Sequence, residues 1–192
     1  MRSKYLSKTQ LETFRKVMGS QWYIFELMRQ TGMRVGDAVK LRGSDISRNG
    51  DSYTVSWVAE KTGKEATASI TASLCRHIQP RSKRAYCFPG RKRGTHLTRQ
   101  AVWARIKKAA EAVGHESDGI SPHSFRKVFA VELMHEEGLS AVQKALQHSN
   151  DAVTRVYAYA DTIMRTDSDE PIRWRDLELI VDYILQRLTE KN

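Results

Sequence analysis

Residues 31–41 read Thr31-Gly-Met-Arg34-Val-Gly-Asp-Ala-Val-Lys-Leu41 and place an arginine between two helices. The spacing of apolar residues over 21–30 predicts a helix, and Gly32 suits the left-handed cap that ends it. A short helix is expected to begin directly after Arg34 and to extend to Leu41. A guanidinium at such a helix start can bind a phosphate through two hydrogen bonds, but on this segment alone a surface ion pair with Asp37 is the commoner role.

Helices are also predicted on both sides of this segment. Ser7 and Gln10 form a capping box that predicts a helix over 8–18, and Leu6 and Leu11 are spaced as a hydrophobic staple. Further helices are expected over 72–79, over 99–113 after a Thr98 cap, over 122–137 from Pro122, over a short stretch to Leu146 that opens on a Ser140–Gln143 capping box, over 151–160, and over 176–188.

The middle of the chain changes from a helical to an alternating pattern. Apolar and polar residues alternate over 53–57, after a turn at Asn49-Gly50, which predicts a strand. A second turn at 62–64 leads into a returning strand over 66–71. The expected fold class is therefore mainly α with a small antiparallel β-hairpin sheet.

The composition is that of an ordinary globular domain, with 40% hydrophobic and 28% charged residues. No stretch approaches the roughly 18 consecutive apolar residues that a membrane span needs. The start of the chain lacks the apolar region of a secretory signal. Cys75 and Cys87 lack the partners and spacing of a zinc site, and so few cysteines indicate a reducing cytoplasm.

The charge is strongly and unevenly positive. The chain has 32 Lys+Arg against 22 Asp+Glu, a formal +10, but residues 160–192 alone carry a net −3. A basic body of this kind favours a polyanionic partner, although a solvated basic surface explains the charge equally well. The residues that we expect to contact such a polyanion lie in a basic loop and at the following helix start: Lys83, Arg84, Arg91, Lys92, Arg93 and Arg99.

A second candidate for binding an anion lies at the start of the helix predicted over 122–137. His123 and Arg126 are three residues apart, so they share one face of the first helical turn. The backbone N–H groups and dipole of a helix start also favour an anion. A His-x2-Arg pair by itself is weak evidence, because many helices begin with one.

Three more residues carry reactive side chains near turns and helix ends. Lys61 lies on the hairpin turn, where a tight backbone could hold an ammonium group as a proton donor, although a solvated turn lysine is the ordinary outcome. A lone histidine such as His148 is more often a cap or core residue, and Tyr157 would usually pack. Tyr157 and Tyr159 would point about 200° apart on a helix, so only one could face a pocket.

The order of these residues resembles the signature of the tyrosine recombinase, or phage integrase, family. The matching residues are, in chain order, Arg34, Lys61, His123, Arg126, His148 and Tyr157. The resemblance covers residues 6–161 and implies a catalytic domain over 1–161. The tail over 162–192 would then be helical and would dock on a neighbouring protomer or pack on its own domain.

The sequence departs from the family pattern in three places. Gln147 stands where a glycine is usual, and Lys127 stands where a histidine commonly follows the second arginine. Most members of the family also have a DNA-clamping domain ahead of the catalytic one. This chain therefore resembles the short, fimbrial-switch type of recombinase, or it is a fragment.

The resemblance also implies a mechanism, with no metal, cofactor or ATP. Arg34 and Arg126 would bind the non-bridging phosphate oxygens, and His148 would add a hydrogen bond there. His123 would help to accept the tyrosine proton, and Lys61 would protonate the leaving 5′-oxygen. Tyr157 would be the nucleophile and would hold the DNA as a 3′-phosphotyrosine.

The implied partner is double-stranded DNA, bound by a homotetramer that is monomeric when free and that associates with the nucleoid. Integration, excision, inversion and resolution all remain open as outcomes. Three other functions are weighed against recombination: a catalytically idle DNA-binding regulator on the same fold, a type IB topoisomerase, and a basic helical binding module without chemistry.

Overall fold

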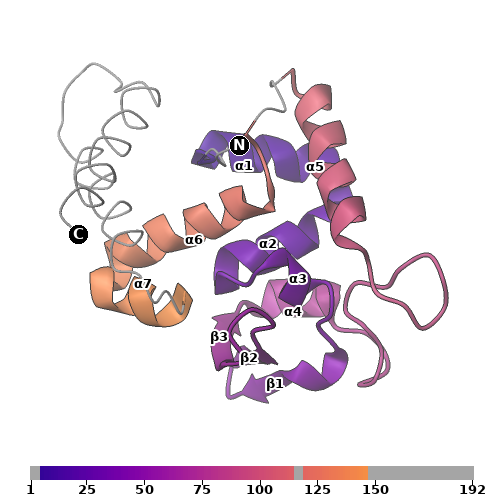
Figure 1. Ribbon diagram of the computed structural model, residues 1–192, viewed down its shortest axis with the longest axis vertical. Coiled ribbons are helices and arrows are strands. Elements are labelled where there is room, and N and C mark those ends of the chain that lie inside the picture. Colours follow the sequence, from indigo (N-terminus) through magenta and orange to yellow (C-terminus); the bar gives the residue numbers. More distant parts are fainter. Residues whose placement is uncertain (1–4, 115–118, 147–192) are drawn as a thin grey trace. The chain divides into compact units, whose positions relative to one another are not determined.

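The computed structural model describes residues 5–114 and 119–146, which are mostly helical with one small sheet (Figure 1). In chain order the elements are α1 Lys8–Met18, η1 Gly19–Trp22, α2 Tyr23–Thr31, α3 Val35–Ala38, η2 Gly43–Asp45, β1 Ile46–Asn49, β2 Ser52–Val58, β3 Glu65–Ile70, α4 Ala72–Ile78, α5 Arg99–Ala112, α6 Pro122–Glu137 and α7 Leu139–Leu146. The contacts divide the chain into two units, residues 1–129 and 130–192. The predicted fold class is confirmed, whereas the expected domain boundary after residue 161 lies outside the described residues.

The capping box predicted for α1 is present. The Ser7 N–H donates to Gln10 Oε1 over 2.9 Å, and the Gln10 N–H donates to Ser7 Oγ over 3.3 Å. Leu6 and Leu11 are both buried, as the staple requires. The local sequence therefore determines where α1 begins.

Replacing Ser7 with alanine should lower the free energy of unfolding by about 1 kcal/mol, because the Gln10 N–H loses its acceptor. Urea unfolding followed by circular dichroism measures the change. Thr9→Ala is the matched control, since Thr9 is exposed in the same helical turn and its side chain does not cap the helix. Equal stability of the two variants would contradict the assigned role of the cap.

The turn between α2 and α3 is held by one threonine. Gly32 adopts the left-handed conformation, with φ 64° and ψ 11°. The Thr31 hydroxyl donates to the Leu27 carbonyl over 2.7 Å and accepts from the Met33 N–H over 3.2 Å. Because Met33 is fully buried, the turn is anchored in the core and Arg34 follows as the N-cap of α3.

The structure corrects three predicted details. The helix after Arg34 ends at Ala38 instead of extending to Leu41. The carbonyl of Leu41 accepts a hydrogen bond from the Cys87 N–H over 2.8 Å, so this part of the chain pairs with a distant segment. Helix α7 begins at Leu139, which places Ser140 inside the helix and not at its N-cap.

The third correction is that the sheet has three strands in the order β1-β2-β3, all antiparallel. The expected hairpin is β2 and β3, and β1 adds a strand in which Ile46 pairs with Val55. Only Ile46 of β1 is buried, so that strand has no alternating pattern. Its place in the sheet depends on pairing with β2, which a local pattern does not reveal.

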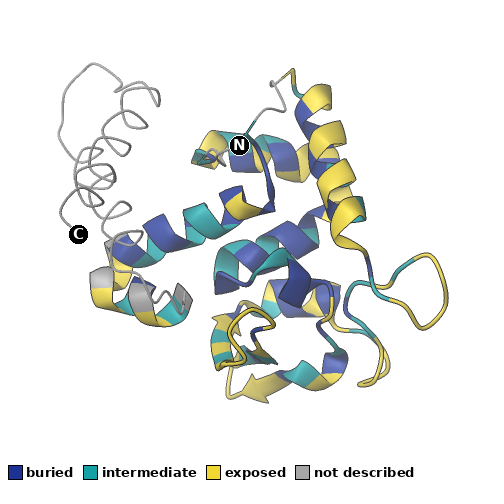
Figure 2. Cartoon of the chain, in the orientation of Figure 1, coloured by how far each residue is buried: buried dark blue, intermediate teal, exposed yellow. Residues whose placement is uncertain are grey.

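Aromatic side chains anchor the start of α6 to α2. Phe25 and Phe125 are fully buried, with ring centroids 4.8 Å apart. Trp22 meets Phe125 edge to face at 5.7 Å. Burial of this kind is visible along α2 and the first turns of α6 (Figure 2). The apolar side of the first α6 turns thus fixes where their polar side chains lie.

The loop between α4 and α5 is more ordered than its composition suggests. Arg42 donates to the Arg84 carbonyl over 2.5 Å and to the Tyr86 hydroxyl over 2.7 Å, and its guanidinium lies 4.0 Å from the Tyr86 ring centroid. Gly90 permits a close crossing, because a Cβ there would lie 2.5 Å from the His96 carbonyl oxygen. These contacts tie the basic loop to the segment that follows α3.

The two cysteines belong to the core. Cys75 and Cys87 are free and buried, and burial raises the pKa of the Cys87 thiol to about 12. Such a thiol is inert at neutral pH. Among residues 5–114 and 119–146, no helix combines the length and hydrophobicity needed to cross a bilayer.

Candidate functional site

Arg34 is half-buried at the start of α3, and its guanidinium forms no ion pair with a described carboxylate. Within the described ranges Arg34 makes no ion pair or hydrogen bond through its side chain. The ion pair with Asp37, the alternative that the sequence left open, does not form. Asp37 Oδ1 accepts from the Glu60 backbone N–H over 3.0 Å instead. Within the described part of the chain, the Arg34 guanidinium is thus available to an anion.

Lys61 is exposed in a tight turn between β2 and β3. The turn closes on Ala59, whose N–H donates to the Lys64 carbonyl over 2.9 Å. The Ala59 carbonyl accepts from the N–H groups of Thr62 at 3.1 Å and Gly63 at 2.8 Å. Gly63 has φ 66°, which favours glycine. The backbone at Lys61 is thus fixed from both sides.

His123 and Arg126 lie on the first turns of α6, as predicted. The Ser121 N–H donates to Ser124 Oγ over 3.1 Å and the Ser124 N–H donates to the Ser121 carbonyl over 2.9 Å, which together hold the helix start. The Arg126 guanidinium donates to the Gly32 carbonyl. Arg126 therefore contacts the same turn between α2 and α3 that presents the first arginine of the site.

The pKa of His123 is lowered by desolvation and by the charges of nearby cations. Although His123 is exposed overall, desolvation of its ring is the largest cause that lowers its pKa below 6.5. The charges of Arg126, Arg34, Lys127 and Lys61 lower it further, in that order. Three predicted catalytic cations therefore lie within electrostatic reach of His123. The imidazole stays neutral at pH 7 and can accept a proton.

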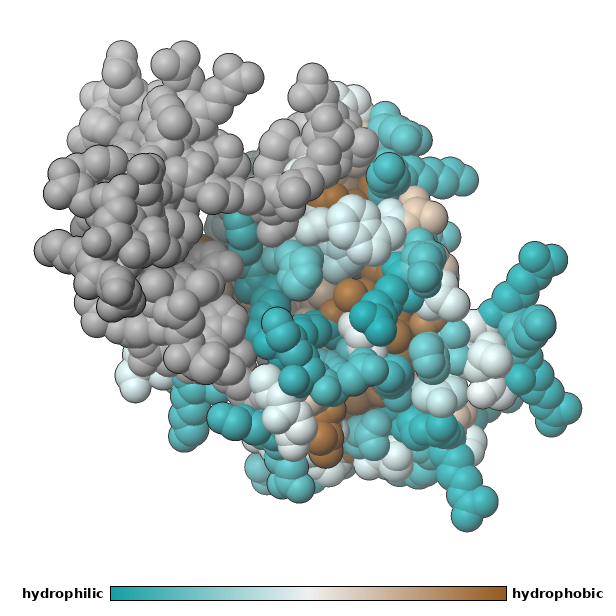
Figure 3. Space-filling view, viewed as in Figure 1, coloured by the Kyte–Doolittle hydropathy of each residue, from teal (hydrophilic) through white to brown (hydrophobic). Residues whose placement is uncertain are grey.

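The predicted DNA-contacting residues separate into two groups. Lys83, Arg84, Arg91, Lys92 and Arg93 are exposed in the loop between α4 and α5. Long hydrophilic side chains project from the side of that loop in Figure 3. Arg99, the first residue of α5, instead lies against α3, with its Cζ 3.7 Å from the position that a Cβ on Gly36 would take. Arg99 is therefore the member of this set that lies beside the candidate site.

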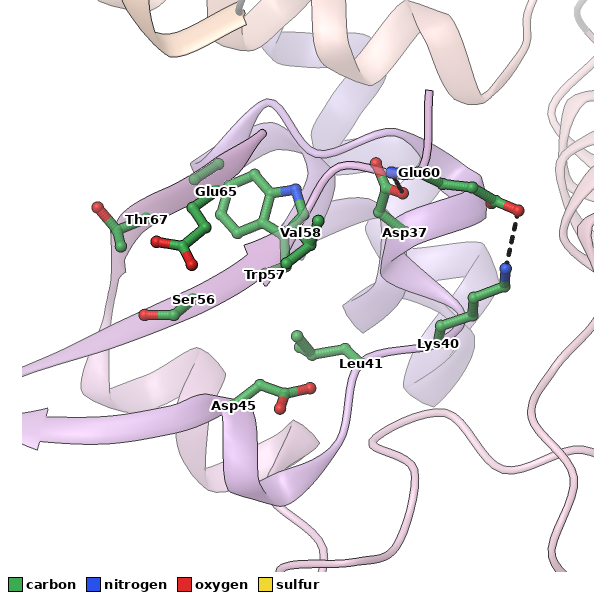
Figure 4. Close-up of a pocket in the computed structure, with 11 residues that line it drawn as sticks. Asp37, Lys40, Leu41, Asp45, Ser56, Trp57, Val58, Glu60, Glu65 and Thr67 are labelled. Atoms are coloured by element: carbon green, nitrogen blue, oxygen red, sulfur yellow. Dashed lines mark hydrogen bonds and ion pairs between the residues drawn. The ribbon is translucent and has the colours of Figure 1, made fainter. Parts of the chain in front are cut away.

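Three further residues lie in or beside the turn of Lys61. The sequence did not single them out for the site. Asp37, Lys40 and Glu60 are joined by hydrogen bonds, and they border a cavity of about 560 Å³ (Figure 4). The cavity has apolar walls from Leu41 and Trp57, with several carboxylates around them. Such a lining would repel a phosphate, so the cationic cluster and not this cavity is the candidate anion site.

Two predicted catalytic residues, His148 and Tyr157, lie outside the described residues, as does Gln147. The site can therefore be built from Arg34, Lys61 and the α6 pair alone. In the described part of the chain, His, Cys, Asp and Glu side chains form no group of three that could hold a metal ion.

Comparison with known protein families identifies the family of this chain. The sequence model of the phage integrase family matches residues 4–164. The chain belongs to the phage integrase family. Curated relatives of this integrase-family chain include the tyrosine recombinase XerD of Vibrio vulnificus, which is 33% identical over 152 residues. The match covers 72% of this chain and 48% of that relative. The XerD of Corynebacterium glutamicum is 31% identical over 144 residues, 71% of the chain and 47% of the relative.

The integrase-family chain thus spans about half the length of the curated relatives it matches. Solved structures show the same fold. The XerH site-specific recombinase bound to a palindromic difH substrate matches with a TM-score of 0.68 and 19% identity, over 85% of this chain and 52% of that one. A lambda integrase dimer bound to a COC′ core site matches with a TM-score of 0.66 and 18% identity, over 90% and 52%.

Proposed function

We propose that this protein is a site-specific recombinase that cuts and rejoins double-stranded DNA through a 3′-phosphotyrosine on Tyr157. The observation that carries the proposal is the contact of the Arg126 guanidinium with the Gly32 carbonyl, two residues before Arg34, next to the imidazole of His123, whose pKa is lowered by the charges of both arginines and of Lys61. A phosphodiester is the ligand that this cluster suits, because it is anionic and its cleavage needs both a proton donor and a proton acceptor. The XerD relatives support the same assignment.

The chemistry balances with the residues present. Tyrosine has a pKa of about 10, so its proton must be removed as Oη attacks phosphorus. His123 accepts that proton while the bond from phosphorus to the 5′-oxygen breaks, and Lys61 protonates the leaving oxygen. Arg34 and Arg126 neutralise the charge that develops on the non-bridging oxygens. His148, assigned from its sequence position, adds a hydrogen bond there.

The covalent intermediate explains how strands could be exchanged without ATP. The ester bond conserves the energy of the original linkage, so the 5′-hydroxyl of a second strand can reverse the reaction. Exchange between two duplexes requires four cuts, which assigns four protomers to the assembled DNA complex.

The test is capture of the covalent intermediate. Nicked duplexes of randomised sequence are incubated with the protein in EDTA, and SDS-resistant complexes are recovered and sequenced. Because the nick lets the cleaved fragment diffuse away, the adduct accumulates. We expect an adduct on a defined DNA sequence. DNA retention without any adduct would overturn the proposal in favour of a catalytically idle DNA-binding protein.

The rate of adduct formation should depend on pH through His123. Its pKa is lowered below 6.5, so the rate should fall on the acid side as the imidazole is protonated, and the midpoint of that acid limb should lie below pH 6.5. The free energy of unfolding should also decrease with acidity. As the pH falls through 6.5, His123 is protonated more readily in the unfolded chain than in the folded one, so protonation favours the unfolded state.

Lys127→Gln tests the cause of this pH dependence. Removing that charge should raise the pKa of His123, and the acid limb of the rate profile should move upward with it. Histidine NMR titration measures the pKa, and single-turnover cleavage measures the limb. A limb that stays in place while the pKa moves would assign the limb to another group.

A further inference from the structure

Glu60, the residue just before Lys61, is held at both ends. Its backbone N–H donates to Asp37 Oδ1 over 3.0 Å, and its Oε1 accepts from Lys40 Nζ over 3.0 Å (Figure 4). Asp37 is only 8% exposed, so the backbone hydrogen bond is shielded from water. The ion pair to Lys40 is about half exposed, with side chains 48% and 51% accessible. We call Asp37, Lys40 and Glu60 the turn clamp.

The turn clamp connects the two segments that carry predicted catalytic cations. Asp37 and Lys40 follow Arg34 within six residues, whereas Glu60 directly precedes Lys61. Glu60 is thus anchored one residue before Lys61, and Asp37 is anchored three residues after Arg34. An exposed ion pair such as the one between Lys40 and Glu60 contributes little to folding stability. The effect of the Lys40–Glu60 ion pair is instead to fix the orientation of the turn that carries Lys61.

The Glu60 carboxylate and the Arg99 guanidinium both lie beside Gly36. Glu60 Oε2 lies 3.4 Å from the position of a Cβ on Gly36, and the Cζ of Arg99 lies 3.7 Å from the same position. The hydrogen bond from Lys40 is the largest cause that lowers the pKa of Glu60, and the charges of Lys40 and Arg99 add to it. The ionised form of Glu60 is thus favoured, and it is this form that pairs with Lys40.

We propose that Glu60 is a positioning residue, which through the turn clamp holds the Lys61 ammonium at the leaving 5′-oxygen. The inference rests on the proposed function, because it needs Lys61 to act as the proton donor. A proton donor must lie within hydrogen-bond reach of the oxygen it protonates, and misplacement by about 1 Å can cost as much as 100-fold in rate. Glu60 itself touches no reacting atom.

A substrate with sulfur in place of the bridging 5′-oxygen separates positioning from other defects. A thiolate is a far weaker base than an alkoxide, so it leaves without the proton that Lys61 supplies. We expect Glu60→Ala to slow single-turnover cleavage of the oxygen substrate about tenfold and to cleave the sulfur substrate at the wild-type rate. Lys61→Ala should show the same rescue from a larger defect. Asp51→Ala, which removes a carboxylate from the exposed turn after β1, should match the wild type on both substrates.

Two results would overturn the positioning role. The first is an equal defect of Glu60→Ala on the oxygen and sulfur substrates, and the second is an unchanged rate on the oxygen substrate. Recovery of the oxygen rate in the swapped variant Lys40→Glu/Glu60→Lys, relative to Glu60→Lys alone, would support the clamp directly.

Hydrogen exchange tests the turn clamp without any DNA. The amide of residue 60 should exchange more slowly than that of Lys61 in the wild type, and Lys40→Ala should speed its exchange. Equal exchange of the two wild-type amides would disprove the clamp. Slow exchange in a wild-type protein that forms no adduct would instead retain the clamp and reject the proposed function.

Discussion

Tyr157→Phe is expected to abolish the covalent protein–DNA adduct while leaving DNA binding unchanged. The substitution removes the one oxygen that would attack phosphorus and retains the ring, so the lost step is bond formation. Denaturing gel electrophoresis of the nicked-duplex reaction measures the adduct, and a mobility shift on the same duplex measures binding. Tyr157 lies outside the described residues, so the expectation depends on its position nine residues after His148.

Tyr159→Phe is the matched control, because it removes the same group two residues away. On a helix the two tyrosines would point about 200° apart, so only one of them could reach the phosphate. We expect Tyr159→Phe to form the adduct at the wild-type rate. An adduct that disappears in Tyr159→Phe and persists in Tyr157→Phe would move the nucleophile to Tyr159.

The parts of the fold that the sequence predicted are those determined by neighbours in the chain. The Ser7–Gln10 box, the left-handed cap at Gly32 and the cap at Thr98 each act within three or four residues, and each is present. Strand β1 was missed because only Ile46 of its four residues is buried, so the strand has no alternating pattern. The ordered basic loop was missed because its partners are remote. Arg42 and Tyr86, for example, are 44 residues apart, so no short-range sequence pattern predicts their contact.

The candidate site follows the same division. Arg34, His123 and Arg126 were candidates because each lies at a helix start, but no single segment was enough to assign any of them to a site. Their grouping came from the order of residues in the family signature. The ion pair between Asp37 and Arg34, which the sequence left open as an alternative, does not form, because Asp37 binds the backbone of Glu60, 23 residues away. The pKa of His123 likewise depends on charges from three separate segments.

The second large effect is expected from Arg126→Ala, which should slow cleavage by about 100- to 1,000-fold, the usual cost of losing one group that stabilises transition-state charge. Arg126→Lys should recover little of this loss. A lysine ammonium is a point charge, whereas the guanidinium can donate to the Gly32 carbonyl with one nitrogen and to a phosphate oxygen with another. Single-turnover rates on the nicked duplex measure both variants.

Arg126→Ala should also leave a signature on its neighbour. After desolvation, the charge of Arg126 is the largest cause of the lowered pKa of His123, so removing it should raise that pKa toward 6.5. Arg76→Ala, which removes an exposed charge from α4, should change neither the rate nor the pKa. A slow Arg126→Ala enzyme with an unshifted His123 pKa would mean that Arg126 acts by holding the turn at Gly32. A rate loss together with a raised pKa would show that the charge of Arg126 acts both on the reaction and on His123, the proton acceptor, as the proposed mechanism requires.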